Sequence, residues 1–90
     1  MCYVYVLVSE HNGRFYVGQT QDFTDRLRQH NAGTQAATRA YLPWRLARVE
    51  RFCTRQEACK RERAIKAKKS RKYIEWLLTQ PCDFREDAIT

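Results

Sequence analysis

The dipeptide Asn12-Gly13, set between two strand-like runs, limits the fold of this chain more than any other feature. Asn-Gly is the strongest short signal for a β-hairpin, because the favoured two-residue turn needs a positive φ at both central residues. In residues 3–8 tyrosines and a leucine alternate with valines, and residues 14–20 are again rich in strand-forming side chains. The sequence therefore predicts an antiparallel hairpin whose first strand is covered on both faces.

The predicted hairpin brings two tyrosines together. Tyr5 and Tyr16 lie on its two strands, and a loop of about five residues lets their side chains stand close together on one face. Gly18 follows on the same face, where a missing side chain leaves room for another group to approach the backbone.

A helix is predicted directly after the second strand. Asp22 is a suitable N-cap, and Ala32-Gly33 is a typical helix end. Arg26 and His30 are four residues apart, so they lie one above the other on this helix. A tyrosine, a fixed cation and a titratable ring can thus meet at one spot. The alternative is a strand and a helix with ordinary surface polar groups.

The second half of the chain predicts one more strand. Residues 34–43 have a loop-like composition, and Pro43 excludes a helix there. Trp44 to Phe52 reads as a third strand. Its interleaved arginines favour an exposed, basic edge strand over a central one.

A capping box, Thr54-Arg55-Gln56-Glu57, predicts the start of the next helix. One stripe of that helix carries Ala58 and Ile65 together with Glu62 and Lys66. An isolated buried carboxylate is very costly, so we expect Glu62 to be paired or to coordinate an ion.

The complete order of elements is β-β-α-β-α-α, with Ser70 introducing a last helix that Pro81 stops. This order predicts an α/β (α+β) fold, a small three-stranded antiparallel sheet flanked by helices. We expect residues 1–80 to form one domain and residues 81–90 an acidic C-terminal tail.

Positive charge is concentrated in one part of the chain. Residues 39–72 hold thirteen Lys and Arg against three Glu, whereas residues 1–38 have no net charge and residues 73–90 are net −3. Such a block is typical of a surface that binds a polyanion, most often nucleic acid. The alternative is a solvated, solubilising face.

Composition excludes other classes. No run approaches the roughly 20 apolar residues of a membrane span, and the apolar start alternates like a strand and lacks the features of a signal peptide. The four cysteines form no C-x-x-C pair, so reduced thiols are expected and a zinc site is poorly signalled. A cytoplasmic protein, associated with the nucleoid when bound to DNA, is the expectation.

Together, these residues resemble the GIY-YIG nuclease superfamily. The resemblance rests on Tyr3-Val4-Tyr5 and, after a hairpin, Tyr16-Val17-Gly18, followed by Arg26, His30 and Glu62. It covers about residues 3–78 and is closest to the small, stand-alone bacterial branch with a single domain.

The resemblance implies a divalent-metal-dependent DNA endonuclease, and relatives act in DNA repair, restriction and intron mobility. It makes Tyr5 and Tyr16 the motif tyrosines, Arg26 the phosphate-binding arginine, His30 the helix histidine and Glu62 the ligand of one Mg²⁺ or Mn²⁺ ion. We expect hydrolysis with Tyr16 as first candidate for the proton acceptor, leaving 5′-phosphate and 3′-hydroxyl ends. The expected nucleic-acid contacts are Arg39, Arg45, Arg48, Lys66 and Lys69.

Two departures from the family pattern leave alternatives open. Tyr3 stands where the family usually has glycine, and no asparagine follows Glu62. A nucleic-acid-binding module without catalysis is therefore the second reading. An adaptor that contacts a partner protein through the acidic tail is the third. The form of the DNA and the oligomeric state are not specified by the sequence.

Overall fold

The protein forms a three-stranded antiparallel sheet in the order β2-β1-β3, seen here in a computed structural model that describes residues 1–33 and 39–82. Three α-helices and one short 3-10 helix complete it. The elements in chain order are β1 (Cys2–Ser9), β2 (Phe15–Thr20), α1 (Phe23–Asn31), η1 (Arg39–Tyr41), β3 (Trp44–Phe52), α2 (Arg55–Ala67) and α3 (Arg71–Leu77). The predicted fold class and the order β-β-α-β-α-α are confirmed.

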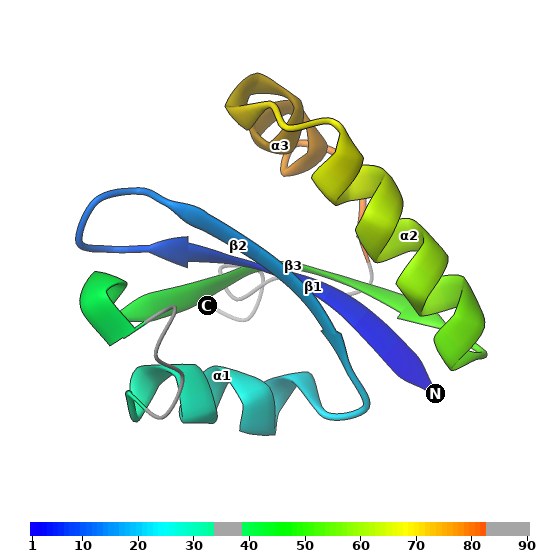
Figure 1. Ribbon diagram of the computed structural model, residues 1–90, viewed down its shortest axis with the longest axis horizontal. Helices are drawn as coiled ribbons and strands as arrows, with labels where there is room; N and C mark the ends of the chain where they lie inside the picture. The colour runs from blue at the N-terminus through cyan, green and yellow to red at the C-terminus, as the bar shows by residue number, and fades with distance from the viewer. Residues whose placement is uncertain (34–38, 83–90) are drawn as a thin grey trace.

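Helices cover both faces of the sheet (Figure 1). α1 lies on one face, and α2 and α3 lie on the other. Each face has its own core, because β1 is buried on both sides. The core on the α1 side contains Tyr5, Leu7, Trp44, Leu46 and Val49. The core under α2 and α3 contains Cys2, Val4, Val6, Val17, Ala58, Ile65 and Leu77.

The turn between β1 and β2 forms at the predicted Asn12-Gly13. Gly13 has a φ of 76°, the left-handed region that glycine adopts without strain, and its amide donates to the Ser9 carbonyl at 2.8 Å. The Asn12 side chain accepts from the Arg14 amide at 3.0 Å. This turn fixes the register, so that Tyr5 pairs with Gly18 across the two strands.

All three α-helices begin at a polar N-cap, as the sequence predicts. The Asp22 carboxylate accepts from the Asp25 amide at 3.0 Å, and Thr54 accepts from the Glu57 amide at 3.2 Å. Ser70 does the same for α3. These bonds satisfy amides that have no partner within the helix, so the three caps fix where each helix leaves the sheet.

β3 is an edge strand, as expected, but the expectation that it is exposed is wrong. Four of its nine residues are buried and only two are exposed, and the pairing with β1 shifts register between Val6 and Leu7. The shift turns Arg48 toward the face covered by α2 and α3, where only 5% of it is exposed.

Arg48 therefore connects β3 to the C-terminal helix. Its Nε donates to Glu50 at 2.7 Å, and its Nη1 donates to the carbonyls of Leu77 and Gln80 at 3.0 and 2.9 Å. Arg61 of α2 binds the same carboxylate through Nε at 2.7 Å. With its donors used in this way, Arg48 is not placed to bind phosphate, contrary to the expectation from sequence.

Two predicted segments extend beyond the described residues. The expected loop 34–43 contains η1, and its residues 34–38 lie outside the description. Residues 83–90 of the predicted acidic tail also lie outside it. Within the described part of the chain, no helix has the length and apolar character that crossing a membrane requires.

Candidate active site

The two motif tyrosines stand together on the face of the sheet covered by α1. Tyr5, from the central strand, is buried, and Tyr16, from the edge strand β2, is half-buried. Their ring centroids are 6.2 Å apart. The Tyr16 ring packs edge-on against His30, with 4.8 Å between the centroids. The Tyr5 phenol is therefore enclosed, whereas the Tyr16 phenol is half-buried on an edge strand of the sheet.

His30 lies beneath these tyrosines and is almost completely enclosed, with 1% of it exposed. Its Nε2 is 3.3 Å from the Tyr5 hydroxyl. Burial lowers the pKa of His30, and the positive charge of Arg26 lowers this pKa further. The ring is therefore favoured in its neutral form, which can accept a hydrogen bond from Tyr5.

The pKa of the Tyr5 hydroxyl responds to its burial and to nearby side chains from three elements. Burial raises the pKa of the Tyr5 hydroxyl, and the neighbouring Tyr16 phenol raises it further. The charge of Arg26 on α1 lowers this pKa, whereas the charge of Glu62 on α2 raises it. A cation and a carboxylate from two different helices thus act on one hydroxyl group, which remains protonated at neutral pH.

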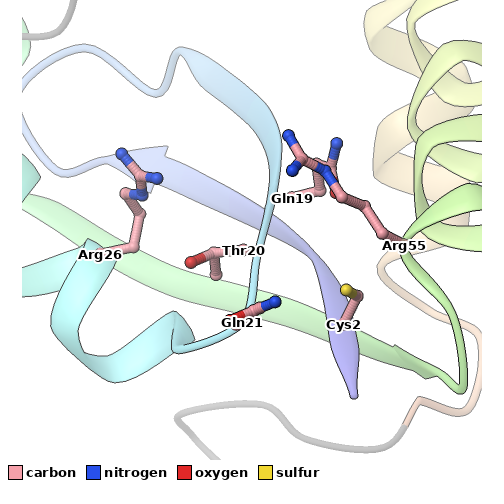
Figure 2. A pocket seen from close by; sticks show the side chains of 6 residues that line it. All are labelled: Cys2, Gln19, Thr20, Gln21, Arg26 and Arg55. Atoms are coloured by element: carbon pink, nitrogen blue, oxygen red, sulfur yellow. The ribbon is translucent and has the colours of Figure 1, made fainter.

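Arg26 presents an uncommitted guanidinium. Asp22, four residues before it, is used as the N-cap of α1, and Arg26 makes no ion pair within the described residues. The side chain lines a pocket at the end of β2 (Figure 2). A guanidinium without a carboxylate partner keeps its planar set of donors available for a phosphate.

Glu62 is the one carboxylate of the predicted set. Its side chain is 19% exposed, and its Oε1 lies 3.6 Å from Nζ of Lys66, one turn further along α2. Residues 1–33 and 39–82 contain no group of three or more His, Cys, Asp or Glu side chains that could hold a metal. Mg²⁺ is commonly held through one or two carboxylates, with waters and a substrate phosphate completing its shell, so a single Glu62 fits such an ion.

The expected nucleic-acid contacts do not form one group. Lys66 and Lys69 line a hollow of about 280 Å³ that Tyr16 also lines. Arg39 and Arg45 are exposed, but Arg45 lies on β3, the strand at the edge opposite β2, where its Nε is 4.0 Å from Glu10. With Arg48 buried, Lys66 and Lys69 are the basic residues of this set that share a hollow with a motif tyrosine, Tyr16.

Comparison with known proteins identifies the family of this chain. Residues 1–74 match the family described as the GIY-YIG catalytic domain. The chain belongs to the GIY-YIG family. The resemblance based on the two tyrosine triplets is thereby confirmed, and with it membership of a nuclease family whose enzymes generally use a divalent metal.

Bacterial and archaeal relatives cover most of this GIY-YIG domain. A UPF0213 protein of Streptococcus pneumoniae is 40% identical over 76 residues, which are 83% of this chain and 76% of that protein. One from Bacillus licheniformis is 37% identical over 87 residues, covering 92% and 89%. One from Halobacterium salinarum is 40% identical over 67 residues, covering 73% and 86%.

A solved structure also matches this GIY-YIG domain. The solution NMR structure of a UPF0213 protein from Bacillus halodurans aligns with a TM-score of 0.56 at 34% sequence identity. The alignment covers 88% of this chain and 84% of that one.

The structure adds a residue that sequence reasoning left without a role. Asn31 ends α1, and its side chain bonds the backbone of Trp44 twice, accepting from N at 2.6 Å and donating to O at 3.0 Å. These bonds fasten the end of the helix that carries His30 to the first residue of β3. A helix-terminal asparagine gives no sequence signal for such a partner, because the contact is between distant segments.

Proposed function

We propose that the protein is a divalent-metal-dependent endonuclease that hydrolyses phosphodiester bonds in DNA and leaves 5′-phosphate and 3′-hydroxyl ends. The observation that carries the proposal is the contact of His30 with both motif tyrosines in a chain of the GIY-YIG family: its Nε2 lies 3.3 Å from the Tyr5 hydroxyl, and its ring centroid lies 4.8 Å from that of Tyr16. Phosphodiester hydrolysis needs a cation for the phosphate oxygens and a group that takes a proton from water. DNA as substrate is supported by the net charge of +7.

Tyr16 is our candidate for the proton acceptor. It lies on the edge strand β2 and is only half-buried, whereas Tyr5 is enclosed, so Tyr16 is the phenol better placed for a water to approach. Tyr5 serves as its protonated neighbour, because burial raises the pKa of Tyr5. Neutral His30 can accept a hydrogen bond from the Tyr5 hydroxyl, which lies 3.3 Å from its Nε2, and this bond orients the hydroxyl.

Arg26 is the candidate clamp for the scissile phosphate. Its guanidinium carries a permanent charge and presents two parallel N–H groups, which match two non-bridging phosphate oxygens. Negative charge grows on these oxygens in the transition state, so a fixed cation there lowers the barrier.

Glu62 is the candidate ligand for one Mg²⁺ or Mn²⁺ ion. When bound there, the ion would supply charge stabilisation to the substrate phosphate and the leaving 3′-oxygen. Lys66 lies 3.6 Å from the Glu62 carboxylate. Together with Lys69, it offers a positive surface to the neighbouring phosphates of the DNA strand.

The test is a substrate panel. Purified protein is incubated with labelled single-stranded, duplex and branched DNA and with RNA, in Mg²⁺, in Mn²⁺ and in EDTA. We expect metal-dependent cleavage with 5′-phosphate ends, detected by end-labelling. Cleavage that persists in EDTA, or that survives both Glu62→Gln and Arg26→Gln, would contradict the proposal.

A non-catalytic nucleic-acid-binding module is the second candidate. It is favoured by the ion pair between Glu62 and Lys66, and by the lack of a group of three or more potential metal ligands in the described part of the chain. Salt-dependent binding to DNA with no cleavage in any divalent metal would support it.

A further inference from the structure

A polar pocket of about 360 Å³ lies at the carboxyl end of β2, between α1 and the start of α2. Among the described residues, its lining contains two arginines and no carboxylate. The lining residues are Cys2, Gln19, Thr20, Gln21, Arg26 and Arg55. The mechanism proposed above uses Arg26 and leaves the rest of this pocket without a role.

The two arginines reach the pocket from opposite sides of β2 (Figure 2). Arg26 comes from α1, with Thr20 on its side of the strand, and Arg55 comes from α2, with Gln19 on its side. Since successive strand residues face opposite ways, the pocket extends around the edge of the sheet. The Gln19 amide donates to Cys59 of α2, which orients it and leaves its second N–H available.

No carboxylate in residues 1–33 or 39–82 forms an ion pair with either guanidinium. Arg55, like Arg26, has no ion pair or hydrogen bond from its side chain among the described residues. The nearest carboxylate of the same helical turn, Glu57, is held by the Thr54 hydroxyl at 3.0 Å. Two like charges that line one pocket without a counter-charge repel each other, so an anion bound between them relieves that repulsion.

The position of Arg55 also argues against a role in helix stability. It is the first residue of α2, and the macrodipole places a partial positive charge at that end of a helix. A cation at this position opposes the dipole, whereas an anion held by Arg55 is favoured by it. The placement thus suits an anionic ligand better than it suits the folded chain alone.

We propose that this pocket binds the phosphate adjacent to the scissile one on the same strand, with Arg55 as its principal ligand and Gln19, Thr20 and Gln21 as polar neighbours. The inference rests on the proposed function, which places the scissile phosphate at Arg26. A DNA strand that passes around the edge of β2 presents successive phosphates to the two sides of that strand, where the two arginines lie. Arg26 would then contact the scissile phosphate while Arg55 fixes the register of the strand.

Arg55→Gln tests the inference, with Arg63→Gln as the matched control. Arg63 is exposed on the same helix and does not line this pocket, so it controls for the loss of one positive charge. Binding of a fluorescent twelve-residue oligothymidylate is measured in EDTA over a range of salt concentrations, where cleavage does not interfere. We expect Arg55→Gln to weaken binding roughly tenfold and to lower the slope of log affinity against log salt by about one.

In the control, we expect Arg63→Gln to change the affinity less than about twofold, because its effect is that of a screened surface charge. Equal losses in the two variants would overturn the inference and indicate diffuse charge attraction. An unchanged affinity in Arg55→Gln would overturn it as well.

A second measurement uses the unaltered protein. The side-chain amide signals of Gln19 and Gln21 are followed by NMR during titration with the dinucleotide pdTpdT, which has two phosphates, and with inorganic phosphate. We expect both signals to shift at lower concentrations of pdTpdT than of inorganic phosphate. Equal affinity for the two probes would indicate a site for a single free anion, and no shift would indicate no site; either result overturns the inference.

These measurements separate the two proposals. They need no metal and no turnover, so a protein that binds as predicted but never cleaves would contradict the proposed function and leave the phosphate pocket standing. A protein that cleaves DNA while Arg55→Gln binds normally would contradict only the pocket.

Discussion

The phenol of Tyr5 occupies the space above the backbone of Gly18. The two residues pair directly across β1 and β2, and a Cβ placed on residue 18 would lie 2.5 Å from the Tyr5 hydroxyl oxygen and 2.7 Å from its Cζ. The sequence indicates that Gly18 leaves room for another group, and in the structure that group is the first motif tyrosine, Tyr5. Gly18 thus determines where the Tyr5 hydroxyl lies relative to His30 and Tyr16.

Gly18→Ala is expected to displace the Tyr5 ring. The strain of overpacking should lower the free energy of unfolding by about 1–3 kcal/mol. A displacement of this size in an active site should also reduce cleavage, by up to about a hundredfold. Urea unfolding and single-turnover cleavage measure the two effects.

A double-mutant cycle with Tyr5→Leu is the control for Gly18→Ala. Leucine lacks the ring atoms that the new Cβ would meet, so Gly18→Ala should cost much less stability in the Tyr5→Leu background than in the unaltered protein. Additive losses would show that the glycine is needed for a reason other than the contact with Tyr5.

Glu62→Gln is expected to abolish metal-dependent cleavage with little effect on the fold. The substitution keeps the size of a side chain whose carboxylate makes one weak contact, with Lys66 at 3.6 Å, so stability should change by less than about 1 kcal/mol. Loss of several kcal/mol of charge stabilisation should reduce the rate by at least about a hundredfold. Glu75→Gln, at an exposed glutamate paired with Arg71, is the control and should cleave at the normal rate.

Arg26→Lys separates charge from geometry at the proposed phosphate clamp. Lysine keeps the positive charge but loses the planar pair of donors, so binding to DNA should persist while cleavage falls about a hundredfold or more. Binding is measured in EDTA and cleavage in Mg²⁺ with the same oligonucleotide. Equal cleavage by the lysine variant would show that Arg26 acts as a point charge only.

Local signals in the sequence were sufficient to predict the elements of this fold. The Asn12-Gly13 turn and the caps at Asp22, Thr54 and Ser70 each depend on residues within three or four positions of one another, so each is visible in the sequence. The proximity of Tyr5, Tyr16 and His30 followed from strand and helix periodicity once the hairpin was placed.

The buried position of Arg48 could not be predicted in this way. Strict alternation from Trp44 would place Arg48 on the α1 face, and the register shift after Leu46 moves it to the opposite face. A one-residue shift in strand pairing cannot be predicted from the alternation of apolar and polar residues. Arg55 was missed for a similar reason, because its pocket is formed by the end of β2, a segment more than thirty positions earlier in the chain.

His30 should make the protein less stable at mildly acidic pH. Burial and Arg26 lower its pKa below the usual 6.5, so the unfolded chain binds a proton at a pH where the folded protein does not. The stability contributed by neutral His30 is therefore fully present above pH 6.5 and is lost as pH falls toward the lower pKa of the folded state. The free energy of unfolding should fall by up to about 1.4 kcal/mol per pH unit in this range.

Urea unfolding at pH 7.0 and pH 5.5 of the unaltered protein and of His30→Gln measures this dependence. The glutamine variant keeps a polar side chain without the titration, so its stability should change less between the two pH values. Parallel pH dependence in the two proteins would assign the effect to other groups.

Glu50→Gln should destabilise the protein strongly, because its carboxylate is shared by two arginines in the core between β3, α2 and α3. Burial alone raises the pKa of Glu50, but hydrogen bonds from Arg61 and Arg48 overcome this and hold it below its usual value. Glutamine would leave the Arg48 guanidinium, which is 7% exposed, without a counter-charge. Breaking a buried pair from one side typically costs about 3–5 kcal/mol. The same Glu75→Gln control removes an exposed pair and should cost less than about 0.5 kcal/mol.

Because Arg48 also holds the carbonyls of Leu77 and Gln80, hydrogen exchange in Glu50→Gln should accelerate first in α3. If α3 exchanges at its normal rate in that variant, Arg48 does not fasten this helix to the sheet.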